Sequence, residues 1–325
     1  MHGHSSEKFW EQFYFDYGHA SIADLGHVVI CFEDITELAA IRLEDEPVWD
    51  GQAKSSRYQN FASDSWYVPS AIHGSETEGT YLGILRSLGE VYRLLHGPLV
   101  TFLSEREPRP DSMKPADYQR TIAARAFDVT RYLLPLACKT NVGQVVSIRT
   151  LEKQITRLLS SQLPELRMIG EDLKDACRRP PVNVWGELSG HTAGLNDPLA
   201  PTLARHAKAN EYQATVYTDL ARFAKEALKG SGLDNPSTWG IQESVELVEP
   251  HDPLEEAVTT LLYRVSQAPY RNILAVVRDW SEKQKRDAIE AATRRRGPYD
   301  ELIKEFRSGY AFIFDILMDI GGWRD

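Results

Sequence analysis

The sequence predicts a helix-rich α+β fold with small antiparallel sheets. Long stretches between residues 78 and 229 place apolar side chains at helical spacing. Residues 27–32 form an apolar, β-branched run suited to a buried strand, and residues 244–249 alternate as a second strand. Helices therefore account for most of the expected structure, and each strand segment is short.

The first half of the chain is predicted to be mostly helical. Residues 6–17 carry aromatic side chains at spacings of one, three and four, which favours an amphipathic helix ended by Gly18. After the first strand, Asp34 is positioned to cap a short helix that runs to about Leu43, and a loop at 44–52 follows. Further helical patterns, separated by Pro, Gly and Asn, cover residues 78–104, 115–137, 144–160 and 165–177.

Two breaker-rich segments divide the second half. Residues 178–201 contain prolines and glycines and predict a linker or surface loop, which precedes a helix at 204–229. Residues 230–240 form a second junction of this kind and mark the expected domain boundary. At 325 residues the chain has room for about two domains of roughly 150 residues each.

A helix start follows the second strand. The Asp252 side chain can cap the helix, Pro253 fits the first turn because its missing N–H costs nothing there, and Glu255 is spaced for a capping box. The remaining helical patterns cover residues 281–296 and 299–318.

Composition limits the classes of partner. Hydrophobic residues make up 42% and charged residues 26% of the chain, as in globular proteins, and the net charge is −10. We expect no nucleic-acid partner, since there is no overall basic field for a polyanion, and any phosphate has to be held by a local cluster of arginines. The N-terminus lacks a leader pattern and no apolar run reaches the ~18 residues of a membrane span. The expectation is a cytoplasmic protein with no membrane partner.

The cysteines and histidines give no metal or disulfide signal. Cys31, Cys138 and Cys177 are scattered, without a C-x-x-C pair, so we expect buried thiols. His2 and His4 belong to a terminal tail, and we assign no metal. The common glycine-rich nucleotide motifs and hydrolase motifs are absent as well.

An internal echo suggests a repeated unit. Residues 32–40 align without gaps on residues 314–322, an offset of 314 − 32 = 282, and aromatic, acidic, aliphatic and small residues recur in order. Repeats of this kind can decide an architecture. We interpret the match as a second copy that has barely begun when the chain ends at Asp325.

A polar constellation in the first half could carry chemistry. It comprises a helix exit at 17–21, a loop at 51–58 and three arginines, and the planar fork of arginine suits phosphate oxygens. The alternative is that these arginines are helix-surface cations with buried stems. The arginines in question are Arg131, Arg149 and Arg157.

The order of four motifs resembles the flavin-dependent thymidylate synthases, the ThyX-like superfamily. The motifs are Gly18-His19-x-Ser21, Ser55-x-Arg57-Tyr58, Arg131-x-x-Leu134-Pro135 and the helix of Arg149. Two of these sequence motifs are most similar to those of the longer, tandem members of the superfamily. They are Tyr17-Gly18-His19-x-Ser21-Ile22 and Gly51-Gln52-x-x-Ser55-x-Arg57-Tyr58. The resemblance covers residues 5–178 and resumes at 244, which implies a ThyX-like unit at 1–178, a linker and connecting helix at 179–240, and the start of a second, truncated unit at 241–325.

The resemblance implies reductive methylation of dUMP to dTMP, with FAD as hydride carrier, methylene-tetrahydrofolate as carbon donor and NADPH as reductant. Active sites of the family lie between subunits, so we expect a homo-oligomer. The matching positions on the flavin side are His19, Ser21 and Arg149. Those on the dUMP side are Gln52, Ser55, Arg57, Arg131 and Arg157, with Arg131 also the catalytic candidate and Arg157 matching one position off.

Departures from the family pattern support an alternative. The Arg-His-Arg triplet of the family falls on Asp45-Glu46-Pro47, which reverses the charge where phosphates are expected and predicts repulsion. The position equivalent to His19 in the second unit is Glu301, since 19 + 282 = 301. The alternative is therefore a non-catalytic ThyX-like scaffold or partner subunit with a degenerate site.

Overall fold

The computed structural model describes residues 8–16, 20–56, 61, 66–182, 197–233, 245–248, 252–307 and 313–318. The chain divides into two compact units. Unit 1 comprises Met1–Leu159, Leu163–Lys208 and Arg324–Asp325, and unit 2 comprises Ser160–Gln162 and Ala209–Trp323. The main point of division lies after Lys208, ahead of residues 230–240, where the sequence places the domain boundary.

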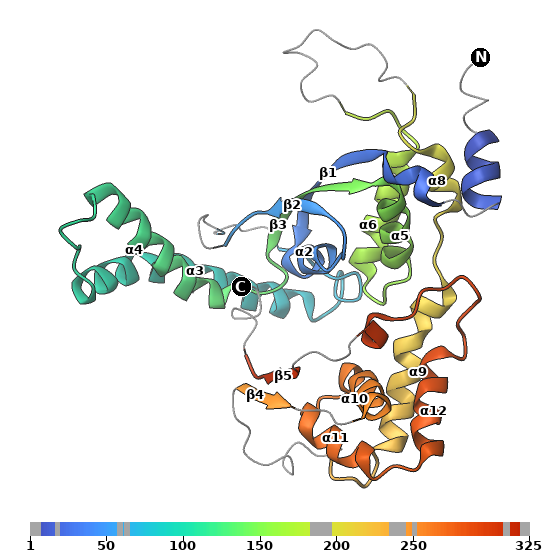
Figure 1. Ribbon diagram of the computed structural model, residues 1–325. Helices are drawn as coiled ribbons and strands as arrows, with labels where there is room; N and C mark the ends of the chain where they lie inside the picture. The colour runs from blue at the N-terminus through green and yellow to red at the C-terminus, as the bar shows by residue number, and fades with distance from the viewer. Residues whose placement is uncertain are drawn as a thin grey trace. The chain divides into compact units, whose positions relative to one another are not determined.

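A three-stranded antiparallel sheet forms the centre of unit 1 (Figure 1). The strands are β1 (His27–Thr36), β2 (Asp50–Ala53) and β3 (Lys139–Ser147), in the spatial order β1-β3-β2. Two short helical segments precede β1: η1 (Trp10–Asp16) and η2 (Ala20–Asp24).

Helices pack on one face of this sheet. They are α2 (Glu37–Glu44), α5 (Ile148–Leu159), α6 (Pro164–Cys177) and α8 (Pro201–His206). Their apolar side chains form a single core with alternate residues of the strands, because successive side chains of a strand point to opposite faces. Core residues include Val28, Phe32, Val142, Val146, Leu151, Ile155, Leu166 and Leu203. Val29 and Val145, which fall between the buried positions, remain exposed.

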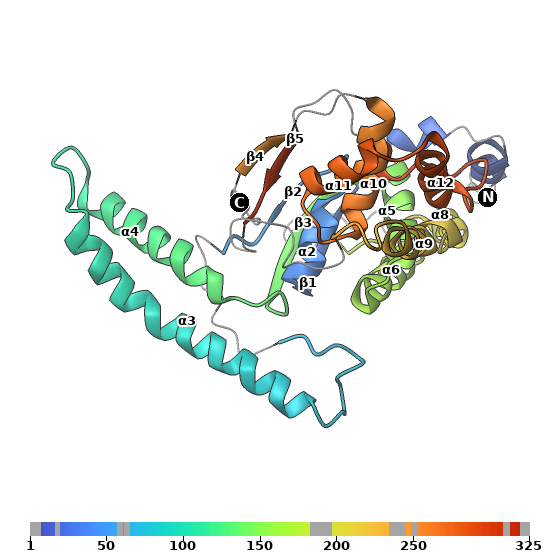
Figure 2. The ribbon, with the colours of Figure 1, turned by 90° about the horizontal axis from the view of Figure 1, so that it is seen from below.

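Unit 1 also contains an antiparallel pair of helices (Figure 2). They are α3 (Glu78–Arg106) and α4 (Pro115–Thr130), and α4 is followed by the 3-10 turn η3 (Arg131–Leu133). Two small apolar clusters stabilise the pair and its junction with β3. One contains Phe61, Trp66, Leu85, Tyr92, Leu134 and Cys138, and the other contains Leu103, Tyr118, Ile122 and Ala126.

Unit 2 is a helical bundle with a two-stranded ribbon (Figure 1). Its helices are α9 (Glu211–Ala227), α10 (Pro253–Val265), α11 (Tyr270–Arg278), α12 (Glu282–Thr293) and the 3-10 turn η5 (Lys304–Arg307). The ribbon pairs β4 (Val245–Val248) with β5 (Ile313–Ile316) in antiparallel register. Two apolar clusters between the helices include Leu228, Val258, Leu262, Ile273 and Ala288 in one, and Tyr212, Val216, Leu220, Leu261 and Ala292 in the other.

The expected fold class is confirmed, and the strongest local signals are confirmed with it. Helix α3 matches the pattern at 78–104, and Asp252 caps α10 by accepting the backbone N–H groups of Leu254 at 2.7 Å and Glu255 at 3.1 Å. The expected role of Glu255 differs, because its carboxylate accepts from Lys285 Nζ at 2.8 Å. A capping box is found instead at the start of α12.

Several element predictions were wrong. The cap of α2 is Thr36, whose hydroxyl oxygen accepts from Ala39 N at 3.0 Å; Asp34 instead lies in a bulge of β1 with φ 57° and donates its N–H to Asn141. The helix expected at 144–160 begins as β3 and becomes helical at Ile148. The helices expected at 115–137 and 204–229 are shorter or interrupted, the loop at 44–52 contains the start of β2, and residues 299–318 contain η5 and β5.

The three cysteines are reduced, and their environments differ. Cys138 and Cys177 are buried, as expected, whereas Cys31 is exposed on β1, which corrects the prediction for that residue. Burial raises the pKa of the Cys177 thiol to about 11, so little of it is thiolate at neutral pH. Within the described part of the chain, no helix has the length and apolar character needed to span a membrane.

Candidate functional site

The flavin-side candidates lie on two segments that an ion pair connects. Ser21 is an exposed residue of η2, and Arg149 lies in the first turn of α5. Arg149 Nε is 2.7 Å from Asp24 Oδ1 at the end of η2, and each side chain is about two-fifths exposed. The pair holds the turn that carries Ser21 against the start of α5. The third candidate, His19, lies outside the described residues.

Gln52 and Ser55 follow the edge of the sheet. Gln52 is exposed on β2, opposite Gly143 of β3, and Ser55 is half-buried two residues beyond the strand. Their position depends on Gly51, where the backbone of β2 comes very close to β3. A Cβ atom at residue 51 would overlap the carbonyl oxygen of Gly143 and the Trp49 ring. A glycine is therefore required there for the approach of β2 to β3. Arg57 lies outside the described residues.

Arg157 forms an ion pair with the Asp45-Glu46-Pro47 segment, which is acidic where the family has the basic Arg-His-Arg triplet. Its guanidinium forms an ion pair with the Glu46 carboxylate; the Glu46 side chain is 5% exposed and that of Arg157 is 38% exposed. Asp45 is more exposed and lies 3.8 Å from Arg42. The sequence predicted that Glu46 repels a phosphate, whereas the structure gives this carboxylate a cationic neighbour. A phosphate at Arg157 would compete with Glu46.

Arg131 occupies a third position, at the start of η3. Its side chain is buried, with 5% exposed, and Arg131 Nη2 lies 3.7 Å from Asp128 Oδ1 one turn earlier. The structure thus brings Arg149 to the turn of Ser21 and brings Arg157 to Glu46. The convergence of His19, Ser21, Ser55, Arg57 and Arg131 on one cleft stays a prediction, because His19 and Arg57 are not described.

Two acidic residues of this region were missed as candidates. Asp24 and Glu46 each bind an arginine of the predicted site, yet the partners in each pair are far apart in sequence. Nothing in the local spacing of either residue signals the pair. The sequence identified Glu46 as part of the Asp45-Glu46-Pro47 segment that replaces the Arg-His-Arg of the family. Only the burial of the Glu46 side chain shows that its carboxylate needs a cationic partner.

What this arrangement offers chemically is anion binding. The described candidates supply guanidinium groups, a hydroxyl and an amide, which are donors for phosphate and carbonyl oxygens. Among the described residues there is no cluster of three or more His, Cys, Asp or Glu side chains suited to a metal ion. The Cys177 thiol is a poor nucleophile, since it is buried and burial raises its pKa to about 11.

Comparison with protein families decides the identity of this unit. Residues 2–179 match the family model described as thymidylate synthase complementing protein, Thy1. The chain belongs to this family. The match covers more than half of the 325 residues and contains all of η1 to α6, so the ThyX-like resemblance of the sequence motifs is confirmed.

Curated relatives extend beyond the part matched by the Thy1 model. A UPF0159 protein of Chlamydia muridarum (strain MoPn / Nigg) is 22% identical over 320 residues, which are 95% of this chain and 57% of the relative. A UPF0159 protein of Chlamydia pneumoniae is 23% identical over 330 residues, 98% of this chain and 58% of the relative. The chain therefore spans somewhat more than half the length of the curated relatives it matches.

Solved structures of related enzymes show distant similarity. The flavin-dependent thymidylate synthase ThyX of Helicobacter pylori, complexed with FAD and dUMP, aligns with a TM-score of 0.34 and 19% identity over 54% of this chain and 78% of that one. The UMP/dUMP methylase PolB of Streptomyces cacaoi, bound with 5-Br dUMP, aligns with a TM-score of 0.39 and 16% identity over 62% and 80%. Membership of the Thy1 family rests on the sequence match to residues 2–179.

Proposed function

We propose that this chain acts in FAD-dependent thymidylate synthesis, the reductive methylation of dUMP to dTMP with methylene-tetrahydrofolate and NADPH. The observation that carries the proposal is the Thy1 match at residues 2–179, which contains every candidate residue from His19 to Arg157. A family match supports the reaction class, and the residues within it supply the site. We further propose a cytoplasmic homo-oligomer, as the family resemblance implies.

The flavin side has donors that fit a pyrophosphate. Ser21 offers an exposed hydroxyl, and the Arg149 side chain remains 40% exposed despite its pair with Asp24. A serine hydroxyl and a guanidinium are suitable partners for phosphate oxygens. In the proposal, Ser21, Arg149 and His19 hold FAD, which supplies the hydride-transfer chemistry when bound.

The substrate side uses residues from the sheet edge and two helical segments. In the proposal, Gln52, Ser55, Arg57 and Arg131 orient dUMP, and Arg157 approaches its phosphate. Burial of Arg131 favours a positioning effect, because a buried guanidinium is held in one geometry. Glu46 weakens this side, since it already neutralises Arg157.

A second candidate function is a non-catalytic scaffold or partner subunit of the same family. The observation that favours it is the Glu46–Arg157 ion pair. A carboxylate that is 95% buried is costly to ionise without a cation, so the pair resists opening for a phosphate. In this case the unit would contribute its fold and surface to an assembly, and its own dUMP side would stay closed.

Flavin binding separates the two candidates. The full chain is purified and its visible spectrum recorded, and FAD and dUMP are then titrated separately by calorimetry into the parent and into Arg149→Gln. A catalytic unit binds FAD, and Arg149→Gln weakens binding by about tenfold, the effect of losing one charge-assisted hydrogen bond. Arg178→Gln is the matched control, because Arg178 pairs with Asp175 at 2.7 Å on an exposed part of α6. A parent protein that binds neither FAD nor dUMP supports the scaffold.

A further inference from the structure

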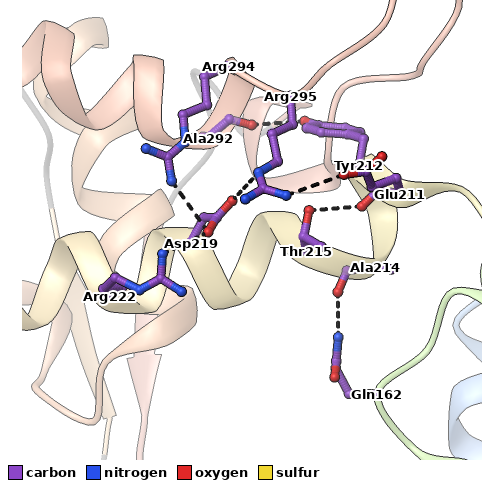
Figure 3. Close-up of polar contacts among 10 residues, drawn as sticks. All are labelled: Gln162, Glu211, Tyr212, Ala214, Thr215, Asp219, Arg222, Ala292, Arg294 and Arg295. Atoms are coloured by element: carbon purple, nitrogen blue, oxygen red, sulfur yellow. Dashed lines mark hydrogen bonds and ion pairs between the residues drawn. The ribbon is translucent and has the colours of Figure 1, made fainter.

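An arginine cluster in unit 2 surrounds one buried carboxylate (Figure 3). Asp219 lies in α9 and its side chain is 4% exposed. Arg222 Nη1 and Arg294 Nη2 lie 3.2 Å and 3.3 Å from Asp219 Oδ1, and Arg295 Nε lies 2.8 Å from Oδ2. Arg222 comes from the same helix, whereas Arg294 and Arg295 follow the last turn of α12.

The charges of this cluster do not balance. Three guanidinium groups face one carboxylate, which leaves two positive charges in excess around Asp219. A second acid, Glu211, lies 3.4 Å from Arg295, and its side chain is 83% exposed, so water screens most of its attraction. Burial raises the pKa of Tyr212; the Arg296 charge lowers it and the Asp300 and Glu305 carboxylates raise it, so charges of both signs surround this tyrosine and add nothing to the excess.

Packing of α9 against α12 does not require all three arginines. Arg295 alone makes the short contact with Asp219 Oδ2, and the Tyr212 hydroxyl joins the helices by donating to Ala292 O at 3.0 Å. Cations do stabilise the carboxyl end of a helix, which accounts in part for Arg294 and Arg295 after α12. That effect does not account for Arg222, which lies within α9.

The outer two arginines remain accessible. The Arg222 side chain is 68% exposed and that of Arg294 is 48% exposed, although both are fixed at one end by Asp219 Oδ1. Anchoring by a buried acid lowers the entropy that each guanidinium loses on binding a second anion. The cluster is therefore a set of partly ordered donors with uncompensated charge.

We propose that Arg222, Arg294 and Arg295 bind a dianionic phosphate group, that of a phosphate monoester or free phosphate. Two positive charges are in excess around Asp219 itself, and the exposed Glu211 offsets part of one of them; this surplus favours a dianion over the single charge of a phosphodiester. Arginine forks bind tetrahedral oxyanions through paired N–H donors. The site belongs to unit 2 and is independent of the dUMP and FAD positions proposed for unit 1.

Binding of small phosphates to the full chain tests this site. Calorimetric titrations use inorganic phosphate, adenosine 5′-monophosphate and dimethyl phosphate, with hydrogen exchange of α9 and α12 as the local readout. We expect saturable binding of a dianion, protection of these helices and no binding of dimethyl phosphate. Tighter binding of the nucleotide identifies an ester as the ligand, whereas equal binding identifies the free anion.

Matched variants locate the binding. Arg222→Gln and Arg294→Gln each reduce affinity by about tenfold, the effect of one charge-assisted hydrogen bond, and both leave Arg295 on Asp219. Arg286→Gln is the control, since Arg286 is 78% exposed on α12 and lies 3.9 Å from Glu282. The proposal is overturned if the Arg222 and Arg294 variants bind phosphate as the parent does, if protection appears elsewhere, or if dimethyl phosphate binds equally well.

Discussion

The two units treat an arginine beside a buried acid in opposite ways. In unit 1, the Arg157 guanidinium forms an ion pair with the Glu46 carboxylate. In unit 2, Asp219 meets three arginines and leaves positive charge in excess. A balanced pair gives an incoming phosphate no net attraction and makes it compete with a resident carboxylate. The comparison shows that the number of arginines near a site is a poor guide to anion binding unless the acids around them are counted.

Removing the buried acid of unit 2 should have the largest effect. Asp219→Ala leaves three guanidinium groups without their carboxylate, and we expect a loss of about 3 kcal/mol, because each contact with a charged group contributes about 1.5–3 kcal/mol and water screens the half-exposed arginines. Urea unfolding, with hydrogen exchange of α9 and α12, measures the loss. Added phosphate should recover part of it, because an anion that binds the folded state stabilises that state.

The control for this experiment is Asp287→Ala. Asp287 pairs with Lys283 at 2.8 Å on α12, and the two side chains are 39% and 84% exposed. Loss of this pair should change stability by less than about 1 kcal/mol. Equal losses for the two aspartate variants would contradict the central role assigned to Asp219.

Filling the close contact between β2 and β3 in unit 1 should cause the next largest loss of stability. Gly51→Ala places a methyl group against the Gly143 carbonyl and the Trp49 ring, and such overpacking costs about 1–3 kcal/mol. Thermal unfolding measures the change. Gly143→Ala is the matched control on the facing strand, because the nearest atom to its new Cβ would be Gln52 O at 3.9 Å. If the control is as damaging as Gly51→Ala, the close approach is not the cause.

Neutralising the acid of unit 1 tests the balanced pair directly. Glu46→Gln releases the charge of Arg157, and we expect dUMP to bind about tenfold more tightly, a change of about 1.4 kcal/mol. Asp45→Asn should have little effect, since Asp45 is 47% exposed and 3.8 Å from Arg42. Calorimetric titration of both variants makes the comparison. Unchanged dUMP affinity in Glu46→Gln would mean that Arg157 does not face the substrate.

The smallest effect is expected for the folding stability of Arg222→Gln. Arg294 and Arg295 continue to neutralise Asp219, and the Arg222 side chain is 68% exposed, so the loss should stay below about 1 kcal/mol. Chemical unfolding of this variant beside the parent provides the number. A loss as large as that of Asp219→Ala would make Arg222 a structural residue and remove the distinction between anchoring and binding arginines.

The sequence was informative where a single local signal determined an element. The segment of α3 keeps helical spacing of its apolar residues over its whole length. Helix α10 begins with Asp252 and Pro253, whose chemistry fits a helix start. Both were predicted within a residue or two. The family motifs likewise identified the Thy1 unit, because they depend on residue order rather than on contacts.

Strand β3 was missed because polar residues occupy its buried face. Thr140 and Gln144 are as buried as Val142 and Val146, so the alternation of the strand does not appear as an alternation of hydrophobicity. Gln144 is accommodated by Gln154, whose Nε2 donates to Gln144 Oε1 at 3.0 Å across the core. Such a partner is set by tertiary packing and has no signature at the position itself.

The charge pairs of both sites were missed for a similar reason. Two ion pairs of unit 1 form only when β1 and β2 pair with β3 and α5 packs against the sheet. They are the Asp24–Arg149 pair and the Glu46–Arg157 pair. In unit 2, Asp219 could be recognised as special only from its burial. The residue types were visible in the sequence, whereas their neutralisation depends on long-range contacts.

The bulge at Asp34 makes one position of β1 tolerant of a change in chain length. Val28 and Phe32 point into the core, and beyond the bulge the next inward residue is Ile35. If Asp34 were deleted, Ile35 would become the second residue after Phe32 and would keep its place in the core, because alternate residues of a strand share a face. A deletion before Phe32 would turn the preceding side chains to the opposite face. An alignment of relatives should therefore place a one-residue gap at Asp34 before any other position of this strand.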